Sequence, residues 1–95
     1  MNIMDLKLYP RDNLLFFEPN KVYVVVSGSI LMKNHERNIL LPQTAAKFSE
    51  GDILNFHQDG SEVFYSVETW FLCQVDTEVA IFEKPFFEEL WKDLF

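Results

Sequence analysis

The sequence predicts one all-β domain, a sandwich, barrel or jelly roll of about eight short strands, followed by a single C-terminal amphipathic helix. Three observations support this fold class. Short apolar runs recur up to Phe82 and are separated by Gly, Pro, Asn and Asp residues that form turns. Lys21–Ser27 has a β-branched centre with poor helix propensity and high strand propensity. After Glu83 the apolar spacing becomes helical. A chain of 95 residues supports one core, so residues 1–95 form a single domain.

The first half of the chain contains five predicted strands. They span residues 6–10, 14–17, 21–27, 30–32 and 39–41. The first is an edge strand that ends at Pro10, because proline cannot donate to a sheet ladder. A bend separates the third from the fourth, since Gly28 can take a positive φ without steric cost. Residues 33–38 form a charged hairpin tip, and Pro42-Gln43-Thr44 breaks the ladder again.

The second half begins with an ambiguous stretch. Residues 45–49 fit either a helical turn or a strand, and we favour an extended segment that carries Phe48 inward. Glu50-Gly51-Asp52 is a sharp turn, in which the Asp52 side chain hydrogen-bonds local amides. The remaining predicted strands span residues 53–56, 62–67, 70–73 and 79–82, with a polar loop at residues 57–61.

The last segment predicts a helix with a broad aromatic face. Pro85 stands where a first helical residue is wanted. The apolar side chains that share the face are Phe86, Phe87, Leu90, Trp91, Leu94 and Phe95. We expect Phe86, Leu90 and Leu94 to be core contacts. The other rings, Phe87, Trp91 and Phe95, exceed what one side of a small roll needs, which leaves a partner-binding surface and a larger core as alternatives.

Composition and charge exclude several partners. The net charge of −7 argues against nucleic acid and against an anionic membrane surface. The sequence has no run of about 18 apolar residues, so we predict no membrane insertion. The first residues lack the pattern of a secretory signal. The single cysteine, Cys73, cannot form an internal disulfide and fits a reducing compartment. We therefore expect an intracellular, cytoplasmic protein.

The chemistry-bearing residues do not form a recognisable catalytic or metal site. His35 and His57 are far apart in polar loops, whereas a cupin-type metal enzyme needs a His-x-His pair, a third His and a Glu. Cys73 has no cationic neighbour in the sequence and is predicted to be a buried structural thiol. Glu88 and Glu89 are predicted to lie on a solvated helix face. We predict no catalytic residue, no metal and no cofactor.

One combination of motifs resembles the cyclic nucleotide-binding domain family. Residues 14–30, Leu-Leu-Phe-Phe-Glu-Pro-Asn-Lys-Val-Tyr-Val-Val-Val-Ser-Gly-Ser-Ile, look like the opening of such a domain. A Gly-Asp-hydrophobic-hydrophobic turn follows in the family, as Gly51-Asp52-Ile53-Leu54 does here. The family then has a strand, a turn and a closing strand before a short helix, which residues 67–82 and 86–94 match. The fold that this resemblance implies is a β jelly roll.

The family's phosphate-binding cassette is not matched. It begins Gly-Glu-hydrophobic-Ala and ends Pro-Arg-small-Ala; its Glu takes the ribose hydroxyl, and its Arg pairs with the cyclic phosphate. Residues 55–66 occupy its place. Asn55 stands where the family has Gly, no arginine follows Arg37, and Asp59 and Glu62 would repel a phosphate. The residues at the family's pocket positions are Asn55, Phe56, Glu62 and Tyr65.

The sequence therefore favours a non-catalytic structural or interaction subunit built on a degenerate cyclic nucleotide-binding-like fold, with other protein subunits as its partners. The alternative is a sensor domain that binds a cyclic nucleotide, cyclic AMP or cyclic GMP, or another small anion in the same pocket. An enzyme of cupin type is a distant third interpretation.

Overall fold

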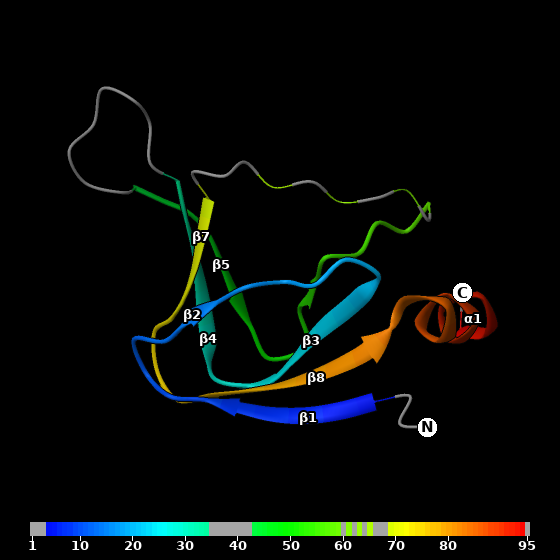
Figure 1. Cartoon of the computed structure of the whole chain (residues 1–95), viewed down its shortest axis with the longest axis horizontal. Coiled ribbons are helices and arrows are strands. Elements are labelled where there is room, and N and C mark those ends of the chain that lie inside the picture. The colour runs from blue at the N-terminus through cyan, green and yellow to red at the C-terminus, as the bar shows by residue number, and fades with distance from the viewer. Residues whose placement is uncertain are drawn as a thin grey trace.

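The computed structural model describes residues 4–34, 43–59, 61, 63, 65 and 69–94, which form two four-stranded sheets and one helix (Figure 1). The first sheet, in the order β1-β8-β3-β6, contains β1 (Met4–Tyr9), β8 (Thr77–Glu83), β3 (Lys21–Ser27) and β6 (Ile53–Leu54). The second sheet, in the order β2-β7-β4-β5, contains β2 (Leu14–Leu15), β7 (Thr69–Cys73), β4 (Ser29–Asn34) and β5 (Gln43–Ser49). The helix α1 spans Lys84–Leu94.

The pairing pattern is that of a jelly roll. Antiparallel pairs β1–β8, β2–β7, β3–β6 and β4–β5 are nested, as if one long hairpin had been folded over and rolled up. The cross-pairs β3–β8 and β4–β7 join the nested pairs into the two sheets. The predicted all-β jelly roll with one C-terminal helix is confirmed.

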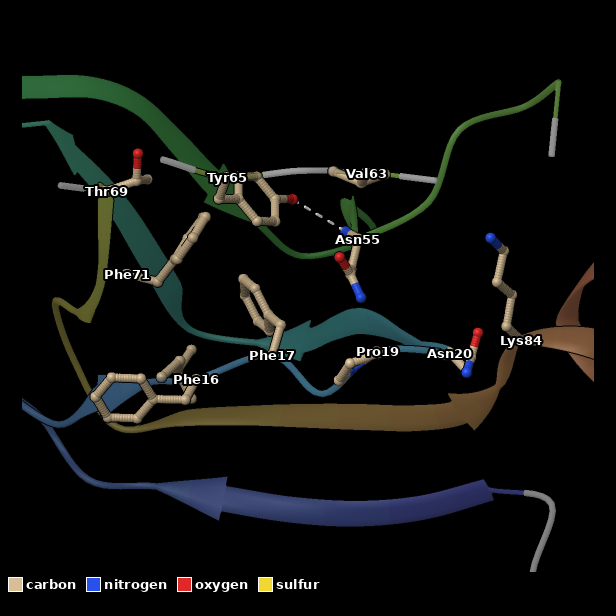
Figure 2. Close-up of a pocket in the computed structure, with 11 residues that line it drawn as sticks. Phe16, Phe17, Pro19, Asn20, Asn55, Val63, Tyr65, Thr69, Phe71 and Lys84 are labelled. Carbon is tan, nitrogen blue, oxygen red and sulfur yellow. Dashed lines mark hydrogen bonds between the residues drawn. The ribbon is translucent and has the colours of Figure 1, made fainter. Parts of the chain in front are cut away.

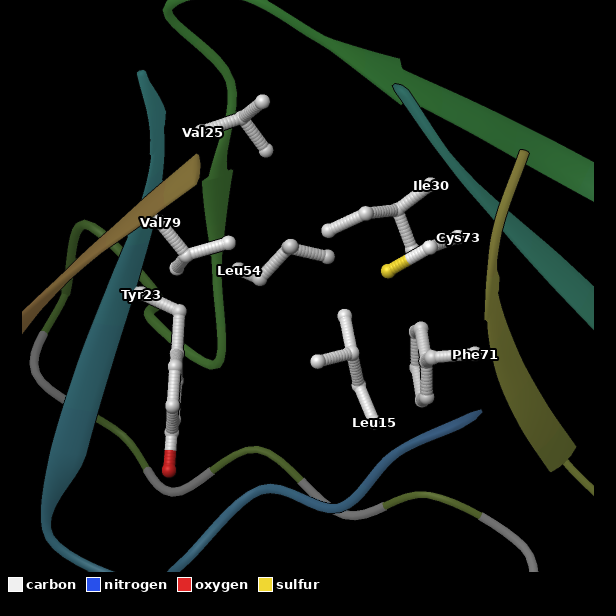
Figure 3. Close-up of a cluster of buried hydrophobic side chains, with 8 residues drawn as sticks. All are labelled: Leu15, Tyr23, Val25, Ile30, Leu54, Phe71, Cys73 and Val79. Carbon is white, nitrogen blue, oxygen red and sulfur yellow. The ribbon is translucent and has the colours of Figure 1, made fainter. Parts of the chain in front are cut away.

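The core lies between the two sheets, where side chains from both converge (Figure 3). Its buried members are Leu15, Tyr23, Val25, Ile30, Leu54, Phe71, Cys73 and Val79. Phe48 of β5 packs against this cluster, as predicted for an extended segment. The apolar strand β3 supplies two core residues, because alternate side chains of a strand point to the same face.

The bend after β3 depends on Gly28. Gly28 has φ of 95°, and a Cβ there would lie 2.5 Å from Thr77 Oγ1 and 2.7 Å from the Asp76 carbonyl oxygen. Thr77 is fully buried; its hydroxyl donates to the Val75 carbonyl at 2.8 Å and accepts from the Ser29 amide at 3.3 Å. The bend at Gly28 and the Ser29–Thr77 hydrogen bond thus bring the start of β4 into contact with the start of β8. The sequence alone did not reveal this contact.

Several predicted boundaries are corrected. Gln43 and Thr44 do not break the ladder: they pair with Asn34 and Lys33, and the irregularity is a register shift between Met32 and Lys33. β2 is shorter than residues 14–17. β6 ends at Leu54 instead of residue 56, because Asn55 takes a positive φ of 64° and turns the chain.

Other predictions fall wholly or partly outside the described residues. Of the hairpin tip predicted at residues 33–38, Lys33 and Asn34 instead extend β4, and residues 35–38 lie outside the described residues. The strand predicted at residues 39–41 and Pro42 also lie outside them. Of the predicted strand at residues 62–67, only residues 63 and 65 are described, and neither is in a strand.

The helix packs on the roll through a different side from the one expected. The Lys84 amide donates to the Asn20 carbonyl at 2.9 Å and fixes the start of α1. Phe87 is buried against Phe82 and is not on an outer surface, whereas Leu90 and Leu94 are exposed. Predicting Leu90 and Leu94 as core contacts was therefore wrong, because aromatic contacts to Phe87 set the rotation of the helix. In the part of the chain that the structure describes, no helix has the length and apolarity needed to cross a membrane.

Candidate functional site

A cavity of about 420 Å³ opens between residues 15–20, which lead from β2 to β3, and the segment that follows β6 (Figure 2). The residues that line it are Leu15, Phe16, Phe17, Pro19, Asn20, Asn55, Val63, Tyr65, Thr69, Phe71 and Lys84. Pockets of about 300–1,000 Å³ hold small organic ligands in proteins. The cavity is therefore large enough for one, and it contains two of the four residues that the sequence placed at the ligand position, Asn55 and Tyr65.

Two left-handed turns shape the wall of the cavity. Asn20 has φ of 65° and Asn55 has φ of 64°, a conformation that asparagine tolerates better than most residues with a side chain. Asn55 stands where the resemblance expects glycine, and it adopts the positive φ that glycine takes most easily. The Asn20 turn places the Lys84 end of α1 beside Pro19 at the same wall.

The polar groups of Asn55 are already engaged by the protein. Its Nδ2 donates to the Lys21 carbonyl at 2.8 Å and to the Glu18 carbonyl at 3.3 Å, which joins β6 to the turn before β3. Its backbone amide donates to the Tyr65 hydroxyl at 3.3 Å, the bond drawn in Figure 2. Asn55 thus acts as a brace between three segments and has few donors left for a ligand.

Aromatic rings form the floor of the cavity. The ring centroid of Phe71 lies 4.5 Å from that of Phe17 and 4.8 Å from that of Tyr65, and both contacts are edge-on. Phe17 also packs on Tyr23, 4.6 Å between ring centroids. Burial raises the pKa of the Tyr65 and Tyr23 hydroxyls, which stay neutral at physiological pH. This lining suits an apolar or aromatic group more than a charged one.

Charge in the cavity is sparse. Of the described residues that line it, Lys84 is the one that carries a positive charge, and none is an arginine. Arg11 is exposed in the turn after β1, where its Nε lies 3.9 Å from Asp12. Lys21 is held by Glu83 at 2.8 Å, a hydrogen bond that raises the pKa of the lysine. Lys84 was not singled out from the sequence; its place just before Pro85, at the junction of strand and helix, was the available signal.

Of the other two predicted pocket residues, the structure describes Phe56, which does not line this cavity. Phe56 points toward α1, with ring centroids 4.9 Å from Phe87 and 5.5 Å from Trp91. Phe56 and Trp91 help to line a second, smaller hollow of about 230 Å³ with Gln58, Asp59, Glu88 and Lys92. Glu62 lies outside the described residues, as does Phe95 of the predicted partner surface.

Cys73, Asp52 and His57 are isolated reactive residues that the structure describes. Cys73 is buried, and burial raises the pKa of its thiol, as expected for a structural cysteine. Asp52 accepts the Ser49 amide at 2.8 Å and is the predicted turn residue. His57 is exposed, and His35 lies outside the described residues. Among the described residues, no three His, Cys, Asp or Glu side chains come close enough to hold a metal ion.

Comparisons with known proteins identify the fold. No protein-family model matches the chain, and no curated protein matches it. Among solved structures, the haem domain of CooA from Carboxydothermus hydrogenoformans superimposes with a TM-score of 0.70 at 17% identity, over 96% of this chain and 62% of that one. A cyclic nucleotide-binding domain from Methylobacillus flagellatus gives 0.67 at 21% identity, over 97% and 52%. The catabolite activator protein of Thermus thermophilus gives 0.65 at 19% identity, over 97% and 43%.

These likenesses establish a cyclic nucleotide-binding-like fold. The chain spans about half the length of the three solved chains named above. A cyclic nucleotide-binding-like protein from Brucella abortus, of which 76% is covered, gives a TM-score of 0.66 at 18% identity. At these identities the likeness concerns the fold, so the ligand and the role of this chain have to be argued from its own residues.

Proposed function

We propose that this chain is a non-catalytic interaction domain inside the cell, which keeps the roll of cyclic nucleotide-binding domains without their phosphate chemistry. The observation that carries the proposal is the lining of the 420 Å³ cavity, in which the described residues offer aromatic rings, neutral amides and a single lysine. A cyclic phosphate placed there would lose its hydration without the bidentate guanidinium partner that suits phosphate geometry. The residues present do not fit that ligand.

The surrounding charge supports the same conclusion. The net charge of −7 opposes the approach of an anionic nucleotide. The donors of Asn55 are committed to the carbonyls of Glu18 and Lys21. The Tyr65 hydroxyl accepts a hydrogen bond from the Asn55 amide, and its ring packs against Phe71, so Tyr65 forms part of the cavity wall.

The proposed partner is another protein subunit, and α1 offers one surface for it. Leu90 and Leu94 are exposed on this helix, and Trp91 lies half-buried beside them. Aromatic residues such as Trp are enriched in protein interfaces. Phe87, which is buried, stacks on Trp91 with ring centroids 6.3 Å apart.

Calorimetry and thermal denaturation of the full chain with cyclic AMP and cyclic GMP test the proposal. A ligand present at 100 times its dissociation constant stabilises the folded state by about 2.7 kcal/mol. We expect no binding heat and no rise in melting temperature with either nucleotide at millimolar concentration. Micromolar binding that is lost when residues 55–66 are altered would overturn the proposal.

A small-anion sensor is the second candidate, and Lys84 favours it. Its side chain lies at one end of the cavity, opposite Phe71 and Thr69 (Figure 2). If an anion binds there, Lys84→Gln should abolish the binding of inorganic phosphate. Lys92→Gln, which changes an exposed lysine of α1 that does not line this cavity, should leave the binding unchanged. Absence of phosphate binding by the unmodified chain would remove this candidate.

A further inference from the structure

Strand β1 is one of the two edge strands of the first sheet, and with six residues it is longer than β6, the two-residue strand at the opposite edge. It pairs with β8 on one side, and no strand of the described residues pairs with its other side. In Figure 1 it runs along the lower margin of the molecule. Its register with β8 is continuous over six residues, without a bulge. Long regular edge strands of this kind are templates for pairing with another chain.

The side chains of β1 divide into an apolar row and a charged row. Met4, Leu6 and Leu8 share one face and are 42%, 60% and 65% exposed. Asp5 and Lys7 share the other face with Tyr9, and the Lys7 ammonium lies 5.1 Å from the centre of the Tyr9 ring. The free edge therefore carries an exposed apolar stripe and one charge of each sign.

We infer that two copies of this chain pair through β1, antiparallel, about a two-fold axis that passes through Leu6. In this register Leu6 faces its own copy, and Met4 faces Leu8 of the second copy. Asp5 lies directly opposite Lys7 of the second copy, and the symmetry produces this pair twice. Opposite charges in directly facing positions stabilise a strand pair. An interface of this kind uses the same patch on both chains, as two-fold symmetry requires.

The charges select this register over its neighbours. A two-fold axis perpendicular to the sheet keeps each side chain on its own face, so only shifts of two residues in the pairing preserve the apolar row. Centring the axis on Asp5 would place two carboxylates face to face, and centring it on Lys7 would do the same for two ammonium groups. Directly facing like charges destabilise a strand pair. The Leu6-centred register alone among these three places opposite charges together.

The paired strands would join the first sheets of two molecules into one continuous sheet of order β6-β3-β8-β1-β1-β8-β3-β6. Six exposed apolar side chains, three from each copy, would then lie side by side on one face. This removes apolar surface from water and satisfies the backbone groups of both free edges. The inference rests on the proposed interaction role and names a second copy as one partner.

Charge reversal tests the inference on the full chain. The variant D5K makes both charged positions of β1 positive, and K7E makes both negative. Analytical ultracentrifugation of the unmodified chain should show a dimer of twice the 11.2 kDa chain mass. Each single variant should dissociate at least roughly tenfold more readily, because two attractive pairs become repulsive. An equimolar mixture of D5K and K7E should form a heterodimer, and the double variant D5K/K7E should recover the homodimer.

The control is K47E, which changes the net charge as K7E does but at an exposed position of β5 in the other sheet. It should dimerise like the unmodified chain. Circular dichroism melts of every variant report whether it is folded, and the heterodimer shows that both single variants fold. A monomeric unmodified chain, or a dimer equally tight in D5K and K7E, would overturn the inference. Neither outcome depends on nucleotide binding, so the calorimetric test stands separately.

Discussion

A methyl group added at Gly28 should destabilise the roll more than the same group added at Gly51. Both glycines have positive φ, 95° and 90°. A Cβ at Gly28 would meet Thr77 Oγ1 at 2.5 Å and the Asp76 carbonyl oxygen at 2.7 Å, whereas a Cβ at Gly51 has no atom within 4 Å. The variants Gly28→Ala and Gly51→Ala therefore share a conformational cost and differ in the steric contact.

The magnitude follows from these contacts. A left-handed alanine costs about 1–2 kcal/mol in either variant, and the less flexible unfolded chain returns about 0.4–1 kcal/mol in both. Gly28→Ala also forces the Asp76–Thr77 backbone to move, and overpacking of this kind costs about 1–3 kcal/mol. We expect Gly28→Ala to have the lower free energy of unfolding by about 1–3 kcal/mol. Each kcal/mol lowers the melting temperature of a domain of this size by about 4–8 °C.

Urea unfolding followed by tryptophan fluorescence and circular dichroism measures both variants under identical conditions. Equal slopes with denaturant concentration would show that the unfolded states are comparable. Equal free energies of unfolding for the two variants would refute the reasoning, because the close approach of Gly28 to Thr77 would then carry no energetic weight.

Three further predictions concern the helix, the cysteine and the alkaline limit. Phe87→Ala should cost about 3–5 kcal/mol of stability, measured by urea unfolding, and Leu94→Ala less than about 0.5 kcal/mol, because Phe87 is buried and Leu94 is 74% exposed; similar losses would place the helix in another rotation. The Cys73 thiol should react with a thiol reagent at the rate of unfolding, because it is buried and its pKa is raised; rapid labelling of the native protein would contradict this. Burial raises the pKa of Tyr23 in the folded state, so the folded state holds its proton more tightly and stability is lost as pH rises above about 10. Tyr23→Phe should make the free energy of unfolding less dependent on pH above about 10, and an unchanged dependence would argue against this cause.

Much of the roll was predictable because short stretches of its sequence have a clear preference for strands and turns. The β-branched run in β3 and the Gly28 bend needed no knowledge of partners, and both are confirmed. The predicted length of β6, residues 53–56, was too great because Phe56 looks like part of the same apolar segment. Phe56 packs on α1 and does not pair in the sheet. The positive φ of Asn55 turns the chain toward α1, and an apolar sequence pattern does not reveal a backbone angle.

The rotation of α1 and the lining of the cavity were less accessible. The apolar face of the helix is so broad that Phe86 and Phe87 fit it equally well, and contacts with Phe56 and Phe82 decide between them. Lys84 joins the cavity because its amide binds Asn20, a residue 64 positions earlier in the chain. Such long-range neighbours follow from the nested topology, which a pattern of strands and turns does not specify.

The nested pairing also sets the order in which this chain can complete its fold. β4 pairs with β5, its nearest partner along the chain, whereas Met4 pairs with Phe82. At about 5–20 residues per second, a ribosome needs roughly 4–15 s to make the residues between these two. β8 lies between β1 and β3, so β1 cannot join the first sheet until β8 has emerged. We therefore expect slow folding that proceeds from the middle of the chain outward, since distant pairings must wait for costly loop closure.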